Sequence, residues 1–236
     1  MNETQFVNQL KEINIEINEE QLNQFERYFE LLVEWNEKIN LTSITEREEV
    51  YLKHFYDCIL SAKYFDYLTI QSLCDIGGGA GFPSIPLKII FPHLQITVVD
   101  SLNKRINFLN TVAMELELEK VRFIHGRAED IAHTELRASF DAVTARAVAR
   151  LSVLSELCIP FVKKGGYFIT LKGDKGQDEL KDSQHAFKVL GIEVDSVYDD
   201  TLPVIEDHRM IGLLKKKYET PKKYPRKAGT PNKKPL

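Results

Sequence analysis

Apolar and polar positions follow two different periods along the chain, one typical of helices and the other of buried strands. Between residues 19 and 40 apolar side chains recur at steps of three and four, which predicts one helix with a single apolar stripe. Trp35 falls on this stripe, so we expect it to pack against a core. Helices are also expected at 3–13 and from Thr45-Glu46 onward. The stripe consists of Leu22, Phe25, Phe29, Leu32, Trp35 and Ile39.

The rest of the chain alternates short apolar runs with helical segments. Such alternation predicts an α/β fold with a parallel sheet. The last two runs are joined by a turn around Pro203, so they predict an antiparallel edge. Helices are expected over 103–116, 151–161 and 177–190, with turns at Gly165-Gly166 and in the polar stretch 125–130. The predicted strands end at Asp75 or span Ile96–Val99, Val121–Ile124, Phe140–Thr144, Tyr167–Leu171, Ile192–Tyr198 and His208–Lys215.

These elements predict a seven-stranded, mostly parallel sheet with helices on both faces and a helical extension at the N-terminus. We expect three segments: the helical extension at 1–68, a Rossmann-like domain at 69–218 and a basic tail at 219–236.

The stretch between the first two strands carries the clearest chemistry. It reads Asp75-x-Gly77-x-Gly79-x-Gly81, and the second strand ends in Asp100. Glycines let the backbone approach a ligand, and Asp100 can accept hydrogen bonds from both hydroxyls of a ribose. We therefore expect a nucleoside-containing cofactor.

The glycine spacing decides which cofactor is expected. The dinucleotide fingerprint needs a third glycine or alanine where this chain has Phe82 or Ser84, and the Gly-Lys-Ser/Thr ending of a P-loop is missing. An acidic residue followed by Gly-x-Gly-x-Gly resembles the class I S-adenosylmethionine-dependent methyltransferases. In that reading Asp75, Gly77, Gly79 and Asp100 bind the cofactor.

Cations follow three successive strands, at the edge where open α/β sheets bind ligands. Arg127, Arg146 and Lys172 are expected to face the substrate there as candidate catalytic residues. Ala128 and Glu129 are expected beside the adenine, and Phe82 near the cofactor.

The residues at this edge limit the methyl acceptor. Amine methyltransferases of bases carry an Asn/Asp-Pro-Pro-aromatic element after the fourth strand, where this chain has Thr144-Ala145-Arg146-Ala147. Methylation at pyrimidine carbon 5 needs a cysteine nucleophile, but Cys74 and Cys158 fall inside a strand and a helix. Guanine N7 has a free lone pair and needs no general base. Arg146 can orient the O6 of that base or a phosphate.

Charge is distributed unevenly along the 236 residues. The net charge is −4, but residues 215–236 carry nine Lys or Arg and one acid, a net +8, which leaves −12 on the first 214. A basic edge on an acidic body suits a polyanion such as RNA. The candidate RNA-binding residues are Arg127, Lys172, Lys222, Lys223, Arg226 and Lys227.

Other sequence signals exclude several classes of protein. No stretch resembles a signal peptide or a membrane span, so we expect a cytoplasmic protein that does not bind membranes. Cys58, Cys74 and Cys158 form no C-x-x-C pair, so buried reduced thiols are expected rather than disulfides or zinc. His54 and Asp57 share a helix face but lack further metal ligands. We expect no bound metal and a monomer.

Several motifs together resemble one family, the ribosomal RNA small-subunit methyltransferases G, also called glucose-inhibited division protein B. The resemblance covers essentially the whole chain. It implies methylation of guanine N7 in 16S ribosomal RNA near the decoding region, with S-adenosylmethionine, on free RNA, the 30S subunit or an assembly intermediate. The motifs are Trp35-Asn36, Asn40-Leu41-Thr42-Ser43-Ile44, His54-x-x-Asp57, the loop from Asp75 to Leu87, Gly126-Arg127-Ala128-Glu129, Ala145-Arg146-Ala147 and Tyr224–Pro235.

The family's cofactor contacts, carried over position by position, fall on Gly77, Phe82, Ala128, Glu129 and Arg146. The ribose argument adds Asp100. Three other readings stay open at this point: a methyltransferase of a small molecule or protein, an RNA-binding module without activity, and a dehydrogenase, which the glycine spacing disfavours.

Overall fold

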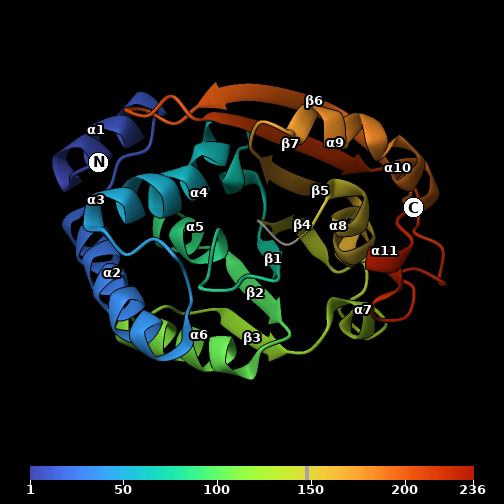
Figure 1. Cartoon of the computed structure of the whole chain (residues 1–236), viewed down its shortest axis with the longest axis horizontal. Helices are drawn as coiled ribbons and strands as arrows, with labels where there is room; N and C mark the ends of the chain where they lie inside the picture. Colours follow the sequence, from blue (N-terminus) through green and yellow to red (C-terminus); the bar gives the residue numbers. More distant parts are fainter. Residues whose placement is uncertain (147–148) are drawn as a thin grey trace.

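A single seven-stranded sheet forms the centre of the molecule in the computed structural model, which describes residues 1–146 and 149–236 (Figure 1). The strand order is β3-β2-β1-β4-β5-β7-β6, with β7 antiparallel to both of its neighbours. The predicted fold class is confirmed. The strands are β1 Ser72–Ile76, β2 Gln95–Asp100, β3 Val121–His125, β4 Phe140–Ala145, β5 Val162–Lys172, β6 Ile192–Thr201 and β7 His208–Lys216.

Helices cover both faces of this sheet, which explains why its inner strands are almost continuously apolar. Side chains alternate between two cores: Leu73 and Ile169 belong to one, Cys74 and Phe168 to the other. The longer helices are α1 Glu3–Glu12, α2 Glu19–Ile39, α5 Ser84–Ile90, α6 Asn103–Glu115, α8 Leu151–Cys158, α9 Gly176–Asp182 and α10 Gln184–Leu190. Short helices and turns are α3 Arg47–Val50, η1 Tyr51–Tyr56, α4 Asp57–Ile59, η2 Leu60–Lys63, η3 Tyr67–Thr69, α7 Ala128–Ile131, η4 Ile159–Phe161 and α11 Thr230–Lys233.

The N-terminal helices belong to the first of these cores. Capping boxes at Asn2 and Asn18 start α1 and α2 by satisfying backbone N–H groups. Phe25 and Tyr28 of α2 are fully buried. The Trp35 ring packs 5.6 Å from the ring of Phe108, so its predicted place against the core is confirmed. The division into segments 1–68, 69–218 and 219–236 stays a prediction, because helix and sheet side chains share this core.

Three local predictions differ from the structure. The predicted turn at Gly165-Gly166 lies inside the longer strand β5, where the register with β4 shifts because residues are inserted. The polar stretch 125–130 contains the start of α7, and the helix predicted over 177–190 is divided at Ser183. Each of these departures is short, so the order of the elements is unaffected.

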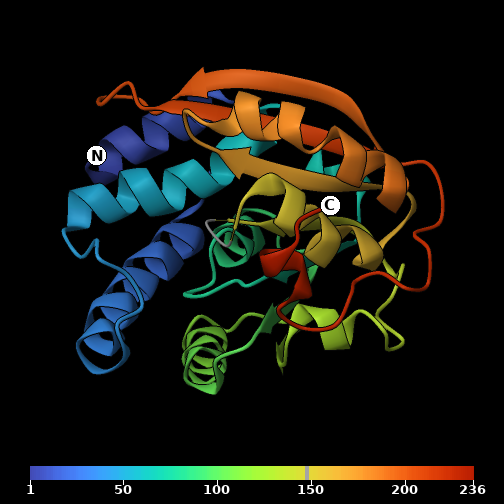
Figure 2. The same cartoon turned by 45° about the vertical axis from the view of Figure 1, so that its right-hand side comes forward.

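The C-terminal segment folds back onto the sheet domain. The helix α11 packs against α8 and lies near α7, as both views show (Figures 1 and 2). Tyr224 and Pro231 of this segment are buried. Across residues 1–146 and 149–236, no helix is both long and apolar enough to span a membrane.

Candidate functional site: the carboxyl ends of the strands

The glycine loop begins where β1 ends and carries positive φ angles at Gly77, Gly79 and Gly81. The N–H of Gly79 donates to Asp100 Oδ2 at 3.0 Å, which ties the loop to the end of β2. A Cβ on Gly81 would lie 2.8 Å from the hydroxyl oxygen of Tyr28, so only glycine fits this position. The Tyr28 hydroxyl in turn donates to the carbonyl of Ala80. Tyr28 of α2 thus packs against the loop and holds it in place.

Asp100 closes β2 beside this loop, as the sequence predicted. Its carboxylate also accepts from the backbone N–H of Leu102 at 2.9 Å and from Arg105 Nη1 at 3.4 Å. A carboxylate has about four acceptor positions. One therefore remains for a ribose hydroxyl.

A cavity of about 400 Å³ opens over the loop and the strand ends. It brings together Gly77, Gly79, Phe82, Asp100 and Arg146, all of which were sequence candidates. The loop after α2 and the wide helical turn η1 add residues from the N-terminal part. The lining consists of Leu41, Thr42, His54, Gly77, Gly78, Gly79, Ala80, Phe82, Asp100, Ser101, Arg105 and Arg146.

Arg146 is held in this cavity by several partners. Its Nη2 donates to His54 Nδ1 at 2.9 Å, and its Nη1 donates to the Lys53 carbonyl at 3.1 Å. Nη1 also lies 3.4 Å from Asp57 Oδ2. The guanidinium sits 5.2 Å from the centre of the Phe82 ring, an arrangement that cation–π attraction favours. Arg146 is therefore fixed in direction before any ligand binds.

His54 is a neutral partner of this arginine. Burial, followed by the nearby Arg146 charge, lowers the pKa of His54 to about 3. Since the guanidinium can only donate, Nδ1 must accept, and the ring proton is on Nε2. That proton points to Thr42 Oγ1 at 2.8 Å. The sequence left the role of the His54-x-x-Asp57 motif open. In the structure, both of its polar residues contact Arg146.

A second, smaller cavity of about 140 Å³ adjoins the first and shares Gly77 and Ser101 with it. It lies at the ends of β1, β2 and β3. Ala128 and Glu129 line it, in keeping with the expected adenine position. Its lining is Ile76, Gly77, Val99, Ser101, Gly126, Arg127, Ala128, Glu129, Leu157 and Asn232.

Asp75 has a different place from the one expected, which was contact with the cofactor. Its side chain is fully buried under the loop, and Oδ2 accepts from Ser84 Oγ at 2.6 Å and from Ser84 N at 3.3 Å. Burial raises the pKa of Asp75 to about 7, against the lowering by these Ser84 hydrogen bonds. Asp75 therefore positions the loop and does not line either cavity. The hydroxyl of Ser84 fixes the position of this carboxylate.

Lys172 and Arg226 are also engaged within the protein. Lys172 Nζ donates to the Ala149 carbonyl at 2.7 Å and lies 2.9 Å from Glu179 Oε2. Arg226 forms an ion pair with the fully buried Glu156 at 2.6 Å. Both charges are therefore paired inside the protein, and the roles predicted for Lys172 and Arg226 toward substrate and RNA stay predictions.

The other predicted cations remain at the surface. Arg127 is half exposed at the mouth of the smaller cavity, with its Nη2 at 3.4 Å from Glu129 Oε1. Lys222, Lys223 and Lys227 are exposed on the C-terminal segment. Ala147 of the predicted Ala145-Arg146-Ala147 motif lies outside the described residues.

The cysteines offer no nucleophile. Cys58, Cys74 and Cys158 are buried free thiols, as predicted. Burial raises the pKa of Cys58 to about 12 and raises the pKa values of the other two well above their usual range. Among the residues described, no cluster of three or more His, Cys, Asp or Glu could hold a metal ion.

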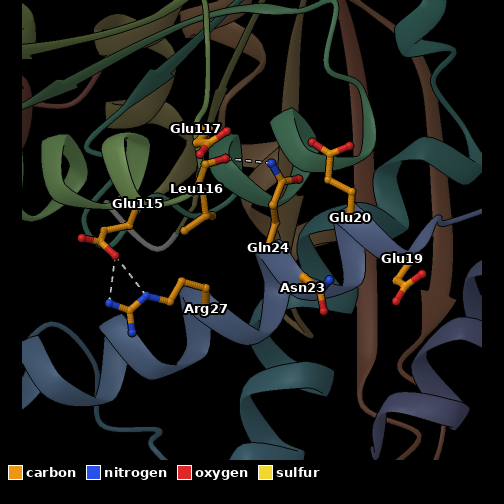
Figure 3. A pocket seen from close by; sticks show the side chains of 8 residues that line it. All are labelled: Glu19, Glu20, Asn23, Gln24, Arg27, Glu115, Leu116 and Glu117. Carbon is orange, nitrogen blue, oxygen red and sulfur yellow. Dashed lines mark hydrogen bonds and ion pairs between the residues drawn. The ribbon is translucent and has the colours of Figure 1, made fainter.

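A further hollow, about 450 Å³, lies elsewhere, between α2 and the end of α6 (Figure 3). Gln24 donates to the Leu116 carbonyl at 2.8 Å and Arg27 to Glu115 at 2.9 Å across it. Four glutamates line it: Glu19, Glu20, Glu115 and Glu117. It contains none of the strand-end residues, so the two cavities at the sheet edge remain the site.

Comparisons with known proteins agree with this arrangement. A family model described as rRNA small subunit methyltransferase G matches residues 21–203. The Ribosomal RNA small subunit methyltransferase G of Macrococcus caseolyticus (strain JCSC5402) is 60% identical over 236 residues, which cover 100% of this chain and 99% of that protein. The protein of the same name from Staphylococcus aureus (strain JH9) is 59% identical over 228 residues, or 97% of this chain and 95% of its own.

Solved structures share the fold at low sequence identity. Cofactor-bound Rv0187 from MTB superposes with a TM-score of 0.58 at 14% identity, covering 83% of this chain and 91% of that one. M. jannaschii TYW2 in complex with AdoMet gives a TM-score of 0.51 at 14% identity, covering 62% and 69%.

The sheet order, the glycine loop and the acid that closes β2 define a class I methyltransferase that uses S-adenosylmethionine. Within that class, the chain belongs to the rRNA small subunit methyltransferase G family. The resemblance based on the motifs is thereby confirmed.

The residues at the sheet edge suit this cofactor. Gly77 and Gly79 leave room along the loop, Asp100 offers an acceptor to the ribose, and Ala128 with Glu129 lines the smaller cavity. When bound, S-adenosylmethionine supplies an electrophilic methyl group. Sequence reasoning missed Thr42 and Asn232 as lining residues, because both reach the site only through long-range folding.

Proposed function

We propose that this protein transfers a methyl group from S-adenosylmethionine to N7 of one guanine in the 16S ribosomal RNA of the small subunit. The observation that carries the proposal is the immobilised Arg146, which faces the cavity beside Phe82. A guanidinium held in one direction can orient a guanine by its O6 or a phosphate, and thereby place N7 in line with the methyl group.

The cavity suits an acceptor that has no proton to lose. Asp100 already accepts three hydrogen bonds. His54 donates its Nε2 proton to Thr42 Oγ1, and its Nδ1 lone pair accepts from Arg146. Among the described lining residues, none is placed as a free general base. Methyl transfer to N7 needs orientation and exclusion of water more than it needs a base.

The RNA surface that we propose consists of exposed cations at the rim of the smaller cavity and on the C-terminal segment: Arg127, Lys222, Lys223 and Lys227. Phosphates attract such side chains without regard to sequence. We further propose that the protein acts in the cytoplasm as a monomer, which light scattering would test against the chain mass of 27.2 kDa.

Transfer of labelled methyl tests the function directly. The substrates are 16S RNA and 30S subunits from a strain that lacks this gene, followed by borohydride and aniline cleavage, which breaks the strand at N7-methylguanine. A single break at one guanine is the expected result. Label that enters RNA without a break would contradict N7 as the acceptor, and absence of label from RNA would favour a small-molecule or protein acceptor.

A further inference from the structure

The C-terminal segment Tyr224–Lys234 is fastened firmly beside the smaller cavity. Arg226 donates from its backbone N at 2.7 Å, from Nε at 2.9 Å and from Nη2 at 2.6 Å to the carboxylate of Glu156. Glu156 is fully buried in α8. Nη2 of Arg226 also donates to the Lys234 carbonyl at 2.8 Å, which closes the segment into a loop. A solvated tail would show none of these contacts.

This loop contacts a residue of the cofactor site. The N–H of Gly229 donates to Glu129 Oε1 at 3.1 Å. Glu129 is only 6% exposed, so its position depends on the few groups around it. The segment therefore orients a carboxylate that lines the smaller cavity.

Asn232, in α11, is the residue of the C-terminal segment that lines this cavity. The remaining lining is mostly apolar or glycine, with Ile76, Val99 and Leu157 as its larger side chains. Asn232 is exposed, and within residues 1–146 and 149–236 its side-chain amide has no hydrogen-bond partner, so both its oxygen and its NH₂ group are accessible to a ligand. A small, mostly apolar cavity with one unpaired amide suits a flat heterocycle that carries a hydrogen-bond donor next to an acceptor.

Adenine has such an edge. An asparagine amide pairs with adenine through two hydrogen bonds, accepting from the exocyclic N6 amine and donating to a ring nitrogen. The larger cavity, with Asp100, takes the ribose and the methionine part, and the two cavities meet at Gly77 and Ser101. The ligand that spans both is the nucleoside cofactor.

We propose that Asn232 binds the adenine base of S-adenosylmethionine, so that the basic C-terminal segment is a wall of the cofactor site as well as a surface for RNA. The inference rests on the proposed position of the cofactor across the two cavities. It gives the segment a function that is measurable without RNA.

Binding of S-adenosylhomocysteine to the full-length protein, measured by calorimetry, tests the proposal. Asn232→Ala should raise Kd about tenfold, because a paired amide contributes on the order of a factor of ten or more in discrimination between bases. Lys233→Ala, one residue away on the same exposed turn, is the matched control and should leave Kd unchanged. An unchanged Kd in Asn232→Ala would overturn the proposal.

A base analogue separates recognition of adenine from a general loss of binding. In S-inosylhomocysteine a carbonyl replaces the N6 amine, so the wild-type protein should bind it more weakly than the adenosine compound. Asn232→Ala should narrow this preference. If the variant weakens both ligands equally, Asn232 does not read the base and the proposal is wrong.

These outcomes are independent of the RNA assignment. Should the wild-type protein bind the cofactor but methylate no RNA, the proposed substrate fails while the Asn232 measurement still applies. Should RNA methylation proceed normally with an unchanged Kd in Asn232→Ala, only this inference fails.

Discussion

Neutral and charged partners together fix the position of the Arg146 side chain before a ligand binds. His54, the Lys53 carbonyl and Asp57 meet it from different directions, and Phe82 lies under its plane. A guanidinium satisfies such a set because its donors form a planar fork. A lysine has a point charge and cannot contact all of them.

Replacing Arg146 by lysine should therefore reduce methyl transfer far more than it affects folding. We expect kcat/KM to fall about 100-fold, as for the loss of a positioned donor, with only a few degrees of change in Tm. Arg209→Lys is the control, since Arg209 Nε donates to Asp57 at 2.8 Å but does not line the cavity. Near wild-type turnover in Arg146→Lys would contradict the assigned role.

His54 should make stability depend on pH. Its pKa is about 3 in the folded protein against an ordinary value of 6.5. Between these values the unfolded chain binds a proton that the folded chain does not, so stability is lost as pH falls from about 6.5 toward 3. From pH 6.5 to pH 5 we expect wild type to lose about 1.5 kcal/mol more than His54→Gln, as measured by urea unfolding. Parallel losses in the two proteins would show that His54 titrates normally.

Residue-level prediction from sequence succeeded where strand order alone decides the position. Asp100 and Arg146 follow parallel strands, and such ends meet at one edge. It did not indicate the partners of Asp75 and Arg226, because burial and distant contacts decide where these side chains lie. The partner of Arg226 is Glu156, 70 residues away in α8, and no local pattern indicates that pairing.

At the scale of elements, the glycine loop contributes to the cofactor site through its backbone conformation. Gly79 has a φ of +59° and open space around its Cβ position, so its substitution introduces backbone strain without a clash. Gly165 in β5 has a φ of +84°, also with open space around its Cβ position, but it lines neither of the two cavities. Substitution of Gly165 is therefore a matched control for substitution of Gly79.

Gly79→Ala and Gly165→Ala should each lower the free energy of unfolding by about 1 kcal/mol, the usual penalty for a left-handed alanine. Only Gly79→Ala should weaken cofactor binding, by about tenfold, since its N–H holds Asp100. Chemical denaturation and calorimetry measure the two effects separately. Equal cofactor affinity in both variants would show that the loop conformation is not needed for binding.

The order of the elements was predictable from the apolar runs, whereas three local details were not. These details are the insertion around Gly165 in β5, the short helix α7 and the break at Ser183, none of which the spacing of apolar residues indicates. The wide turn η1, which carries His54, was anticipated only as part of a helix. Such turns often occur at functional sites, and this one faces the larger cavity.

On the scale of the whole molecule, charge is segregated. The segment 215–236 has a net charge of +8 and the first 214 residues have −12, and the segment lies next to the cofactor cavities. We propose that an RNA drawn to the exposed cations of this segment is brought close to the cofactor cavities, while the acidic body repels it elsewhere.

Removing two of these cations should change the salt dependence of RNA binding. For Lys222→Ala with Lys223→Ala we expect the slope of log Kd against log salt to decrease by about 1.5, because each phosphate contact contributes about 0.7 to 0.9. The affinity for S-adenosylhomocysteine should stay as in wild type. Lys11→Ala, on α1 at the other end of the molecule, is the control (Figure 1). A wild-type slope in the double variant would remove these lysines from the RNA surface.

The position of Asn232 after β7 in the chain has a consequence for the order in which the cofactor site is completed. Translation produces β7, which completes the sheet at Lys216, before it produces Asn232. A chain in which β7 has paired but the C-terminal segment has not folded back therefore has the sheet and the glycine loop without the adenine wall. If Asn232 binds the base, full affinity for the cofactor then appears only when this segment has folded against α8.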